Sequence, residues 1–317
     1  MTVAETNRTW EPHQIDVATA GTDDLAEWLA DLGPQPLTGL LTEHKALVFR
    51  GFRITAESVE PVLDQLVPGR LPYVHGNSPR TRVRGNLYTS TEYPQQFTIS
   101  MHNELNYARR WPERLAFFCE RAAESGGATP VLDGRLWLAA LDPEVRDAFA
   151  GGVRYVQNLH DGYGLGKSWQ DTFETDDRAS VEEFLADAEA QWEWTRNGLR
   201  VTQTRAATTR HPVTGAEVWF NQADQWHPAG LEDTTASSLY SLLKPDEFPQ
   251  YVTFADGSPI PDEYVAQIRG RGLENSVDVD WREGDILLID NVLTAHGRRP
   301  FTGPRRILVA MSGLSAG

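Results

Sequence analysis

Two histidines and one glutamate are the residues whose types and spacing best suit chemistry at a metal ion. His102 and Glu104 stand two positions apart in FTISMHNELNY, so an extended chain would turn both side chains to one face. His296 follows the apolar run 286–289, and we expect a polar turn after that run to deliver its imidazole. Two histidines and a carboxylate bind one face of a metal and leave the other face open, as non-haem Fe(II) sites require.

An H-x-E pattern alone is weak, because short patterns arise often by chance. Two residues at fixed distances from it strengthen the interpretation. Thr129 follows the glycine pair of ESGGATPVLDGR and begins an extended run, and Arg306 lies ten residues after His296 at the head of ILVAM. A dicarboxylate that chelates a metal needs a cation for its far carboxylate, and a guanidinium with a hydroxyl beside it suits that role.

Longer motifs surround these residues: HNELNYARRWPERLAFFCERAAESGGATPVLDGR, WFNQ and DNVLTAHGRRPFTGPRRILVAM. From Ala46 to the C-terminus the chain resembles the taurine dioxygenase (TauD/TfdA) family of Fe(II)- and 2-oxoglutarate-dependent oxygenases. Within that family it is similar to the branch of the syringomycin aspartyl hydroxylase. The resemblance implies His102, Glu104 and His296 as iron ligands, and Thr129 and Arg306 as the residues that hold 2-oxoglutarate. The wider family mostly has Asp where this chain has Glu104, which favours the amino-acid oxygenases of antibiotic pathways.

The implied reaction consumes dioxygen and 2-oxoglutarate, releases succinate and carbon dioxide, and hydroxylates a substrate carbon. Desaturation or cyclisation of the substrate stays open. Halogenation is not expected, because Glu104 fills the position that a halogenase leaves for chloride. The implied substrate is an amino acid or an amino-acid-derived unit, either free or presented by a carrier protein.

Two other classes of function use the same ligands. A zinc hydrolase would bind metal through His and carboxylate and keep a site for water, but it would have no use for Thr129 and Arg306 as a pair. A cupin-like binding protein would hold a metal without turnover. Fe(II) and 2-oxoglutarate added without oxygen separate the three, since a visible charge-transfer band requires the keto acid on a ferrous ion.

Several polar residues are candidates for contact with the substrate. Asn106 and Tyr107 follow the proposed ligand pair, and Asn221 follows a buried run, where an amide must find a partner. His160 and His227 flank a presumed lid and the WFNQ segment. We interpret the remaining histidines as structural or surface residues: His13, His44, His75 and His211. His211 belongs to a predicted hairpin connection, and Asp290 and Asn291 are predicted to shape the turn before His296.

Composition restricts the partners. With 45 acidic and 29 basic side chains the net charge is −16, which argues against nucleic acid and against an anionic membrane surface. A carrier protein, itself acidic, would need a local basic patch, for which Arg80, Arg82 and Arg84 or Arg109 and Arg110 are candidates. No run of eighteen apolar residues occurs and the N-terminus lacks signal-peptide order, so a cytoplasmic enzyme is expected. Cys119 is the one cysteine and is interpreted as a buried structural thiol.

Short strand-like runs spread over the whole chain without regular alternation with helices, and this pattern predicts a mainly β fold with flanking helices. The family resemblance makes it a double-stranded β-helix, a cupin-like jelly roll. We predict one domain over residues 1–317. Helices are predicted over 23–33, 56–69 and 180–194, the last with a capping box of Ser180 and Glu183. The glycine-rich segment 160–194 is predicted to close over the site as a lid, with Tyr163 and Trp169 as its aromatic surface.

Overall fold

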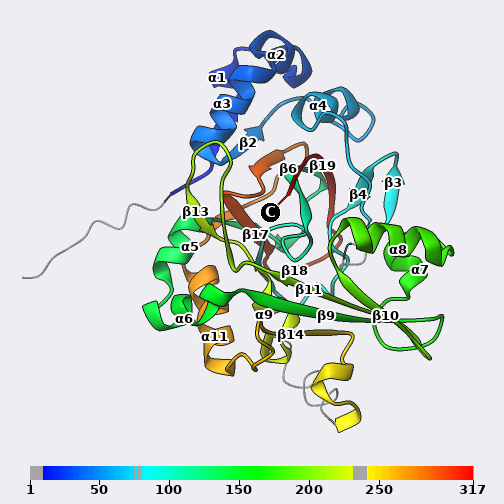
Figure 1. The fold of residues 1–317 in the computed structure, drawn as a ribbon. Coiled ribbons are helices and arrows are strands. Elements are labelled where there is room, and N and C mark those ends of the chain that lie inside the picture. Colours follow the sequence, from blue (N-terminus) through cyan, green and yellow to red (C-terminus); the bar gives the residue numbers. More distant parts are fainter. Residues whose placement is uncertain (1–9, 75, 77–79, 231–240, 317) are drawn as a thin grey trace, which may run out of the picture.

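The computed structural model describes residues 10–74, 76, 80–230 and 241–316. Its centre is a jelly-roll barrel made of two sheets that face each other (Figure 1). Within the described residues the larger sheet has seven strands in the order β1-β2-β16-β6-β19-β4-β3, and the smaller has four in the order β15-β8-β17-β5. The predicted fold class is therefore confirmed.

Apolar side chains of the central strands of the larger sheet are buried on both of its faces. Its strands are β1 (His13–Asp16), β2 (Ala46–Arg50), β16 (Ile286–Asp290), β6 (Arg110–Arg121), β19 (Arg306–Ala316), β4 (Leu87–Thr89) and β3 (Arg82–Arg84). In β16, Leu288 packs in the outer core and Leu287 in the barrel interior. The same alternation in β19 turns Ile307 inward and Leu308 outward. Neighbouring side chains therefore face opposite environments, as the period of a strand requires.

The smaller sheet carries most of the polar residues of interest. Its strands are β15 (Val277–Val279), β8 (Thr129–Asp133), β17 (Thr294–Arg298) and β5 (Ile99–His102). The glycine pair before β8 turns with φ of 69° at Gly126 and 75° at Gly127. A Cβ at Gly126 would lie 2.4 Å from the carbonyl oxygen of Pro300. Both the backbone angle and this close approach require glycine, and the predicted turn into an extended run at Thr129 is confirmed.

Four helices cover the outer face of the larger sheet (Figure 1). They are α1 (Val17–Ala20), α2 (Leu25–Leu32), α3 (Pro34–His44) and α4 (Glu60–Leu66). Asp24 caps α2 by accepting from the backbone N–H of Glu27, and Leu25 and Leu29 are buried on its inner face. The predicted helices over 23–33 and 56–69 thus exist, each somewhat shorter than its sequence pattern.

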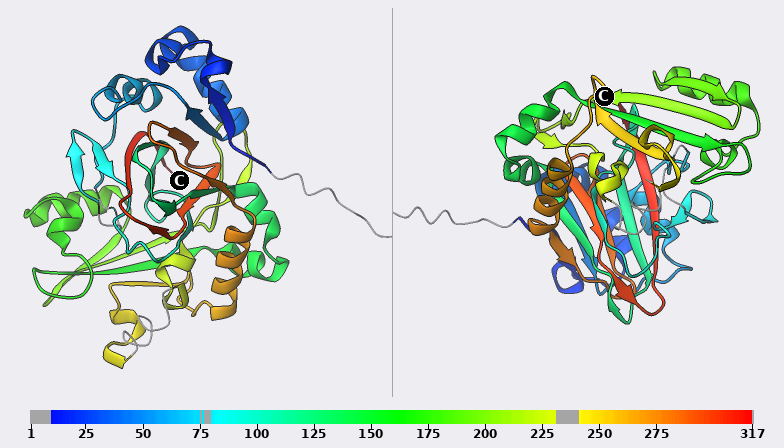
Figure 2. Two further views of the ribbon diagram at one scale, coloured as in Figure 1. Left: turned by 180° about the vertical axis from the view of Figure 1, so that it is seen from behind. Right: turned by 90° about the horizontal axis from the view of Figure 1, so that it is seen from below.

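A third sheet crosses one end of the barrel (Figure 2). Its order is β10 (Gln191–Thr195), β11 (Gly198–Arg205), β9 (Val153–His160) and β14 (Gln250–Phe254). The segment from β9 to β10, residues 160–194, contains α7 (Trp169–Phe173) and α8 (Arg178–Asp187). We call this segment the insertion. Trp169 is buried in its small core, so it offers no surface to a substrate, whereas Tyr163 is 96% exposed.

The predicted start of α8 is wrong. Asp177, not Ser180, is its N-cap and accepts hydrogen bonds from the backbone N–H groups of Ala179 and Ser180. An aspartate three residues before the serine competes for the same exposed N–H groups, and a carboxylate is the stronger acceptor. The helix also ends at Asp187, and Trp192 lies in β10.

The outer face of the smaller sheet is covered by the remaining helices. These are α5 (Gly134–Ala140), α6 (Pro143–Ala148), α9 (Ala223–Trp226) and α11 (Asp262–Glu274), with the 3-10 turns Phe149–Gly151, Pro228–Gly230 and Pro245–Glu247. Two short ladders complete the fold, β12 (Thr208–Arg210) with β13 (Glu217–Trp219) and β7 (Ser125–Gly126) with β18 (Phe301–Thr302). In the described part of the chain, no helix has the length and apolarity that a membrane crossing demands.

Candidate metal centre

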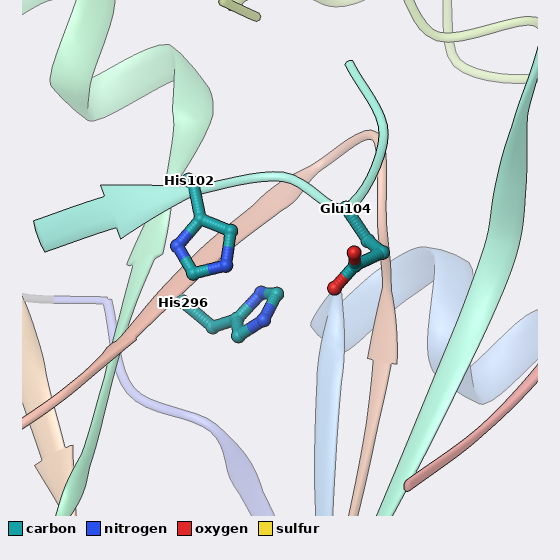
Figure 3. A group of neighbouring side chains, drawn as sticks. All are labelled: His102, Glu104 and His296. Atoms are coloured by element: carbon teal, nitrogen blue, oxygen red, sulfur yellow. The ribbon is translucent and has the colours of Figure 1, made fainter. Parts of the chain in front are cut away.

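His102, Glu104 and His296 converge inside the barrel. One potential ligand atom from each residue lies within 4.8 Å of the other two. The two imidazoles and the carboxylate face a common space in Figure 3. All three residues are buried, between 4% and 7% exposed. The structure therefore brings together the three residues that the sequence pattern singled out.

The local structure around them differs from the expectation. His102 is the last residue of β5, and Glu104 already lies in the turn that follows. Leu105 adopts a φ of 57° in this turn, which non-glycine residues rarely do. His296 lies within β17 and not in the turn before it, directly opposite His102 in the β5–β17 ladder. The pairing of β5 with β17 therefore brings the two imidazoles together, with ring centroids 4.3 Å apart.

Hydrogen bonds orient the His102 ring. Its Nδ1 lies 3.0 Å from the carbonyl oxygen of Ser100. A proton on Nδ1 would be donated to this carbonyl, which only accepts, and this tautomer keeps the lone pair of Nε2 for a metal; the side-chain nitrogen of Gln225 also lies 3.1 Å from Nδ1. Gln225 donates to the same carbonyl at 3.0 Å and holds it in place.

Burial favours the neutral form of both imidazoles. Burial lowers the pKa of His102, and burial lowers that of His296 well below its ordinary value, with His102 and Arg80 as further causes. Neutral imidazole is the form that binds a metal.

Asn291 fastens the backbone of Glu104. Its side-chain oxygen accepts from the Glu104 N–H at 2.8 Å, and its side-chain nitrogen donates to the Glu104 carbonyl at 3.0 Å and to the Pro112 carbonyl at 2.8 Å. The buried amide of Asn291 therefore ties the turn of Glu104 to the connection between β16 and β17, 187 positions away in sequence. Asn103 also donates to the Asn291 carbonyl.

Asp290 shapes the turn that leads into β17. Its Oδ1 accepts from the backbone N–H groups of Val292 and Leu293, each at 2.9 Å. Its Oδ2 lies 3.0 Å from Nε2 of His211. The predicted turn-shaping role of Asp290 is confirmed, and His211, in the predicted hairpin connection between β12 and β13, is a buried structural residue.

The donor set fits iron(II). Two neutral imidazoles and one carboxylate, all on one side of a shared space, match the facial arrangement of non-haem Fe(II) sites. The state of His296 Nδ1 supports this assignment, because this nitrogen is buried and has no hydrogen-bond partner among the described residues. His102, Glu104 and His296 would hold the ion, which when bound activates dioxygen.

A cavity beside the two histidines contains the groups that a dicarboxylate needs. Its lining includes Thr129, Arg298 and Arg305 together with Phe117 and Ile307. The Arg305 side chain donates from Nε to the Gly127 carbonyl at 3.0 Å. Burial, followed by the charge of Arg298, lowers the pKa of Arg305 to about 10. A guanidinium in this state gains stability from an incoming carboxylate.

Arg306, the predicted partner of 2-oxoglutarate, is not among the residues that line this cavity. Its side chain is 48% exposed and forms an ion pair with Glu120. The register of β19 shifts between Arg306 and Ile307. Side chains of a strand alternate between its two faces. Because Ile307 faces the barrel interior, Arg305 also faces the interior and Arg306 points away from it. The motif has two adjacent arginines, and the signal that separates them is the inward apolar series starting at Ile307.

Thr129 lies in the cavity as predicted. Its hydroxyl oxygen accepts from the Trp281 indole N–H at 3.0 Å. The hydroxyl proton remains available, because a hydroxyl both accepts and donates. Thr129 can therefore donate to a carboxylate in the cavity.

Arg80 is a further residue of this site that the sequence interpretation missed. It was considered only as part of a surface patch, yet its side chain is 2% exposed and its Nη2 donates to Glu104 Oε2 at 2.5 Å. Burial is the largest single influence and acts to lower the pKa of Arg80, but the charge and hydrogen bond of Glu104 together with Tyr73 and Tyr107 outweigh it, so the pKa is raised. No local sequence pattern marks Arg80 as buried.

The candidates for substrate contact separate into two groups. Asn106 is buried two residues after Glu104, and neither its side-chain oxygen nor its nitrogen has a partner among the described residues. Tyr107 is buried against Trp226, with ring centroids 5.0 Å apart. Asn221, by contrast, uses its amide on the backbone, donating to Ala207 at 2.9 Å and accepting from Ala223 at 3.1 Å.

The two histidine candidates lie elsewhere. His160 lines a separate cavity with Tyr163 and Pro249, and Nδ1 of His227 accepts from the backbone N–H of Ala229 at 3.2 Å. None of the five candidates for substrate contact is among the residues that line the cavity of His102 and His296. His75 lies outside the described residues. Cys119 is fully buried, and burial raises the pKa of its thiol to about 12, in agreement with a structural role.

Comparisons with known proteins agree with this chemistry. The family model "Taurine catabolism dioxygenase TauD, TfdA family" matches residues 10–311. The dapdiamide synthesis protein DdaC of Enterobacter agglomerans is 34% identical over 305 residues, which cover 95% of this chain and 91% of that protein. A clavaminate synthase-like protein of Arabidopsis thaliana is 32% identical over 292 residues, covering 87% and 83%.

Solved structures show the same fold at low sequence identity. The PvcB protein of Pseudomonas aeruginosa superposes with a TM-score of 0.55 at 15% identity, covering 98% of this chain and 94% of that one. A 2,4-D dioxygenase homologue from Burkholderia xenovorans gives 0.52 at 12% identity, covering 98% and 95%.

The match of the family model over nearly the whole chain decides against the zinc hydrolase and against the non-catalytic binding protein. Fe(II), 2-oxoglutarate and dioxygen are the cofactor and co-substrates that this membership brings. The chain belongs to the TauD/TfdA family and is an Fe(II)- and 2-oxoglutarate-dependent dioxygenase.

Proposed function

We propose that His102, Glu104 and His296 hold the iron, and that the enzyme hydroxylates an amino acid or an amino-acid-derived small molecule in a specialised biosynthetic pathway. The single observation that carries the metal assignment is the buried convergence of the three ligand atoms within 4.8 Å. Hydrogen bonds that fix the His102 ring and the Glu104 backbone support it, because preorganised ligands are what a metal site needs.

Arg305 and Thr129 hold the far carboxylate of 2-oxoglutarate in this proposal. Arg305 replaces Arg306 because it lines the cavity beside His102 and His296, whereas Arg306 is paired with Glu120. The guanidinium supplies charge and a planar fork, and the Thr129 hydroxyl supplies one more donor. The apolar side chains of Phe117 and Ile307 limit water in the cavity.

The substrate class rests on similarity. The curated relative with 34% identity is named for dapdiamide synthesis, and the other is named as clavaminate synthase-like. Both names fit small molecules of specialised metabolism and agree with the expectation from Glu104. Asn106 lies in the turn that contains Glu104, and its two buried amide atoms have no hydrogen-bond partner among the described residues, so we keep it as the first candidate for substrate contact.

The insertion, residues 160–194, remains a proposed lid. Two polar contacts join the insertion to residues on either side of Arg80. Lys167 donates a hydrogen bond to the Gly76 carbonyl at 3.0 Å, and Glu174 forms an ion pair with Arg82 at 2.8 Å. A change in the position of the insertion would therefore be transmitted to the segment beside Glu104. Closure would exclude water during turnover.

The test of the reaction is the stoichiometry of co-substrate use. Oxygen uptake and succinate release are measured with Fe(II), 2-oxoglutarate and a panel of amino acids and amino-acid derivatives. The expected result is one succinate per oxygen consumed, stimulated by a member of the panel that gains a hydroxyl group. Product mass that shows loss of two hydrogens in place of a gained oxygen would instead identify desaturation or cyclisation.

A further inference from the structure

Arg80 has no part in holding iron or the far carboxylate of 2-oxoglutarate, yet it lines the same cavity as His102 and Thr129. One nitrogen of its guanidinium, Nη2, donates to Glu104. The guanidinium also lies over the ring of Tyr73, 4.4 Å from the ring centroid. These two contacts fix the position and the plane of the group.

The other two nitrogens of Arg80 are available. Nε and Nη1 are buried, and neither has a hydrogen-bond partner among the described residues. Together they carry three N–H donors. A buried donor without a partner typically destabilises a protein by about 1 to 3 kcal/mol. Such donors beside a reaction centre indicate a place where a ligand supplies the acceptor.

The charges around the cavity favour an anionic acceptor. Arg80, Arg298 and Arg305 line it, and among the described lining residues there is no carboxylate. With iron(II) bound, five positive charges would face three negative ones, namely those of Glu104 and of dianionic 2-oxoglutarate. The two terminal nitrogens of Arg298 already donate to backbone carbonyls of residues 93, 94 and 97, so Arg80 has the free donors.

We propose that Arg80 receives the carboxylate of the substrate and that the substrate is therefore a free amino acid or its N-acyl derivative, not a thioester on a carrier protein. The inference rests on the proposed function and deepens it. A thioester carbonyl is neutral, so it would accept a hydrogen bond but leave the excess of positive charge in the cavity unchanged. A carboxylate would accept the hydrogen bonds of Arg80 and would also offset the positive charge of the cavity.

The protein surface agrees with a free substrate. The arginines that were candidates for a carrier-binding patch are paired with acids on the protein itself: Arg82 with Glu174, Arg84 with Glu60, Arg109 with Glu189 and Arg110 with Asp187. The net charge of −16 would also repel an acidic carrier.

The experiment uses the full-length protein, loaded without oxygen with Fe(II) and 2-oxoglutarate, and follows the visible charge-transfer band. Common L-amino acids and their N-acetyl derivatives are added one at a time. Each responsive compound is then compared with its carboxamide and its N-acetylcysteamine thioester, which mimics the carrier-bound form. Wild type, Arg80→Gln and Arg80→Lys are examined, with Arg84→Gln as the matched exposed control.

We expect a free acid to perturb the band, and its amide and thioester to bind about 100-fold more weakly, as loss of a buried charge pair implies. Arg80→Gln should weaken the free acid by a similar factor and leave the 2-oxoglutarate midpoint within about threefold, with no effect of Arg84→Gln. Arg80→Lys keeps a positive charge beside Glu104. If Arg80→Gln no longer binds iron, substrate affinity can therefore still be measured from the charge-transfer band of Arg80→Lys.

Three results would overturn the inference: a thioester that binds as well as the acid, no response to any free acid, or Arg80 variants that weaken 2-oxoglutarate and spare the substrate. The last result would mean that the carboxylate at Arg80 belongs to 2-oxoglutarate. Failure of the band to form in the wild type would instead refute the proposed iron site, so the two failures are distinguishable.

Discussion

The two sides of the metal site are held by different kinds of interaction. On the side of β17, Asn291 and Asp290 hydrogen-bond to backbone groups, and His296 sits in a strand paired on both edges. On the opposite side, Arg80 comes from a segment outside the barrel strands and is held through side chains, by Glu104 and by the ring of Tyr73.

This difference separates two tasks. Metal ligands must be fixed closely, and rigid strands with backbone-directed bonds achieve that. Substrate recognition tolerates and often uses segments that can move. The iron side should therefore respond to substitution with loss of metal, and the Arg80 side with loss of substrate affinity.

The largest effect is expected on the iron side. Alanine at His102, Glu104 or His296 should abolish Fe(II)-dependent turnover, because each ligand side chain faces the cavity. Thermal unfolding of the metal-free variants should stay close to wild type. Oxygen uptake at the wild-type rate in any one variant would remove that residue from the triad.

Next in size is the contrast between Arg305 and Arg306, which are neighbours on opposite faces. Arg305→Ala should weaken 2-oxoglutarate binding by about 3 to 5 kcal/mol, the usual loss when a buried charge pair is cut on one side. Arg306→Ala breaks only a half-exposed pair with Glu120 and is the matched control. Titration of 2-oxoglutarate measures both. A larger effect of Arg306→Ala than of Arg305→Ala would refute the assignment of Arg305 to the cavity side of the chain and of Arg306 to the outer side.

Much of this site was predictable from sequence, and the failures have physical causes. Residue type and spacing pointed to the triad and to Thr129, and the family resemblance implied their roles. Arg305 was missed because a register shift changes which of two adjacent arginines faces inward. Arg80 was missed because nothing next to it in sequence is apolar enough to predict burial; its buried position depends on tertiary contacts, among them Glu104, 24 positions away, and the ring of Tyr73.

Asp224 precedes Gln225 in α9, and it should make the free energy of unfolding depend on pH. It is 1% exposed, and burial raises its pKa to about 6. A raised carboxyl pKa means that stability is lost as pH rises from about 4 to 6 and stays lower above that. Asp224→Asn should therefore raise the free energy of unfolding at pH 8 by up to about 3 kcal/mol and leave it nearly unchanged at pH 4. Denaturant unfolding at both values, with exposed Asp147→Asn as control, checks this sign.

Asn291→Ala should reduce metal affinity without removing any ligand. Loss of a residue that orients a ligand usually lowers affinity about 10- to 100-fold. Isothermal titration of the metal-free protein with Mn(II) would measure it. Affinity equal to wild type would show that the Glu104 turn is held without Asn291.

The smallest effect is expected at the insertion. Glu174→Gln breaks a largely exposed pair with Arg82, which is worth at most about 1 kcal/mol. It should modestly increase limited proteolysis within residues 160–194, and Fe(II) with 2-oxoglutarate and substrate should suppress that cleavage under anaerobic conditions. Identical cleavage with and without these ligands would leave the insertion with no gating role.

The iron assignment is tested most directly by an anaerobic Fe(II) titration in the presence of 2-oxoglutarate. The account predicts a visible charge-transfer band that saturates at one equivalent of iron in the wild type and is missing after Glu104→Ala. A band of the same strength in Glu104→Ala, or its absence from the wild type, would contradict the assignment.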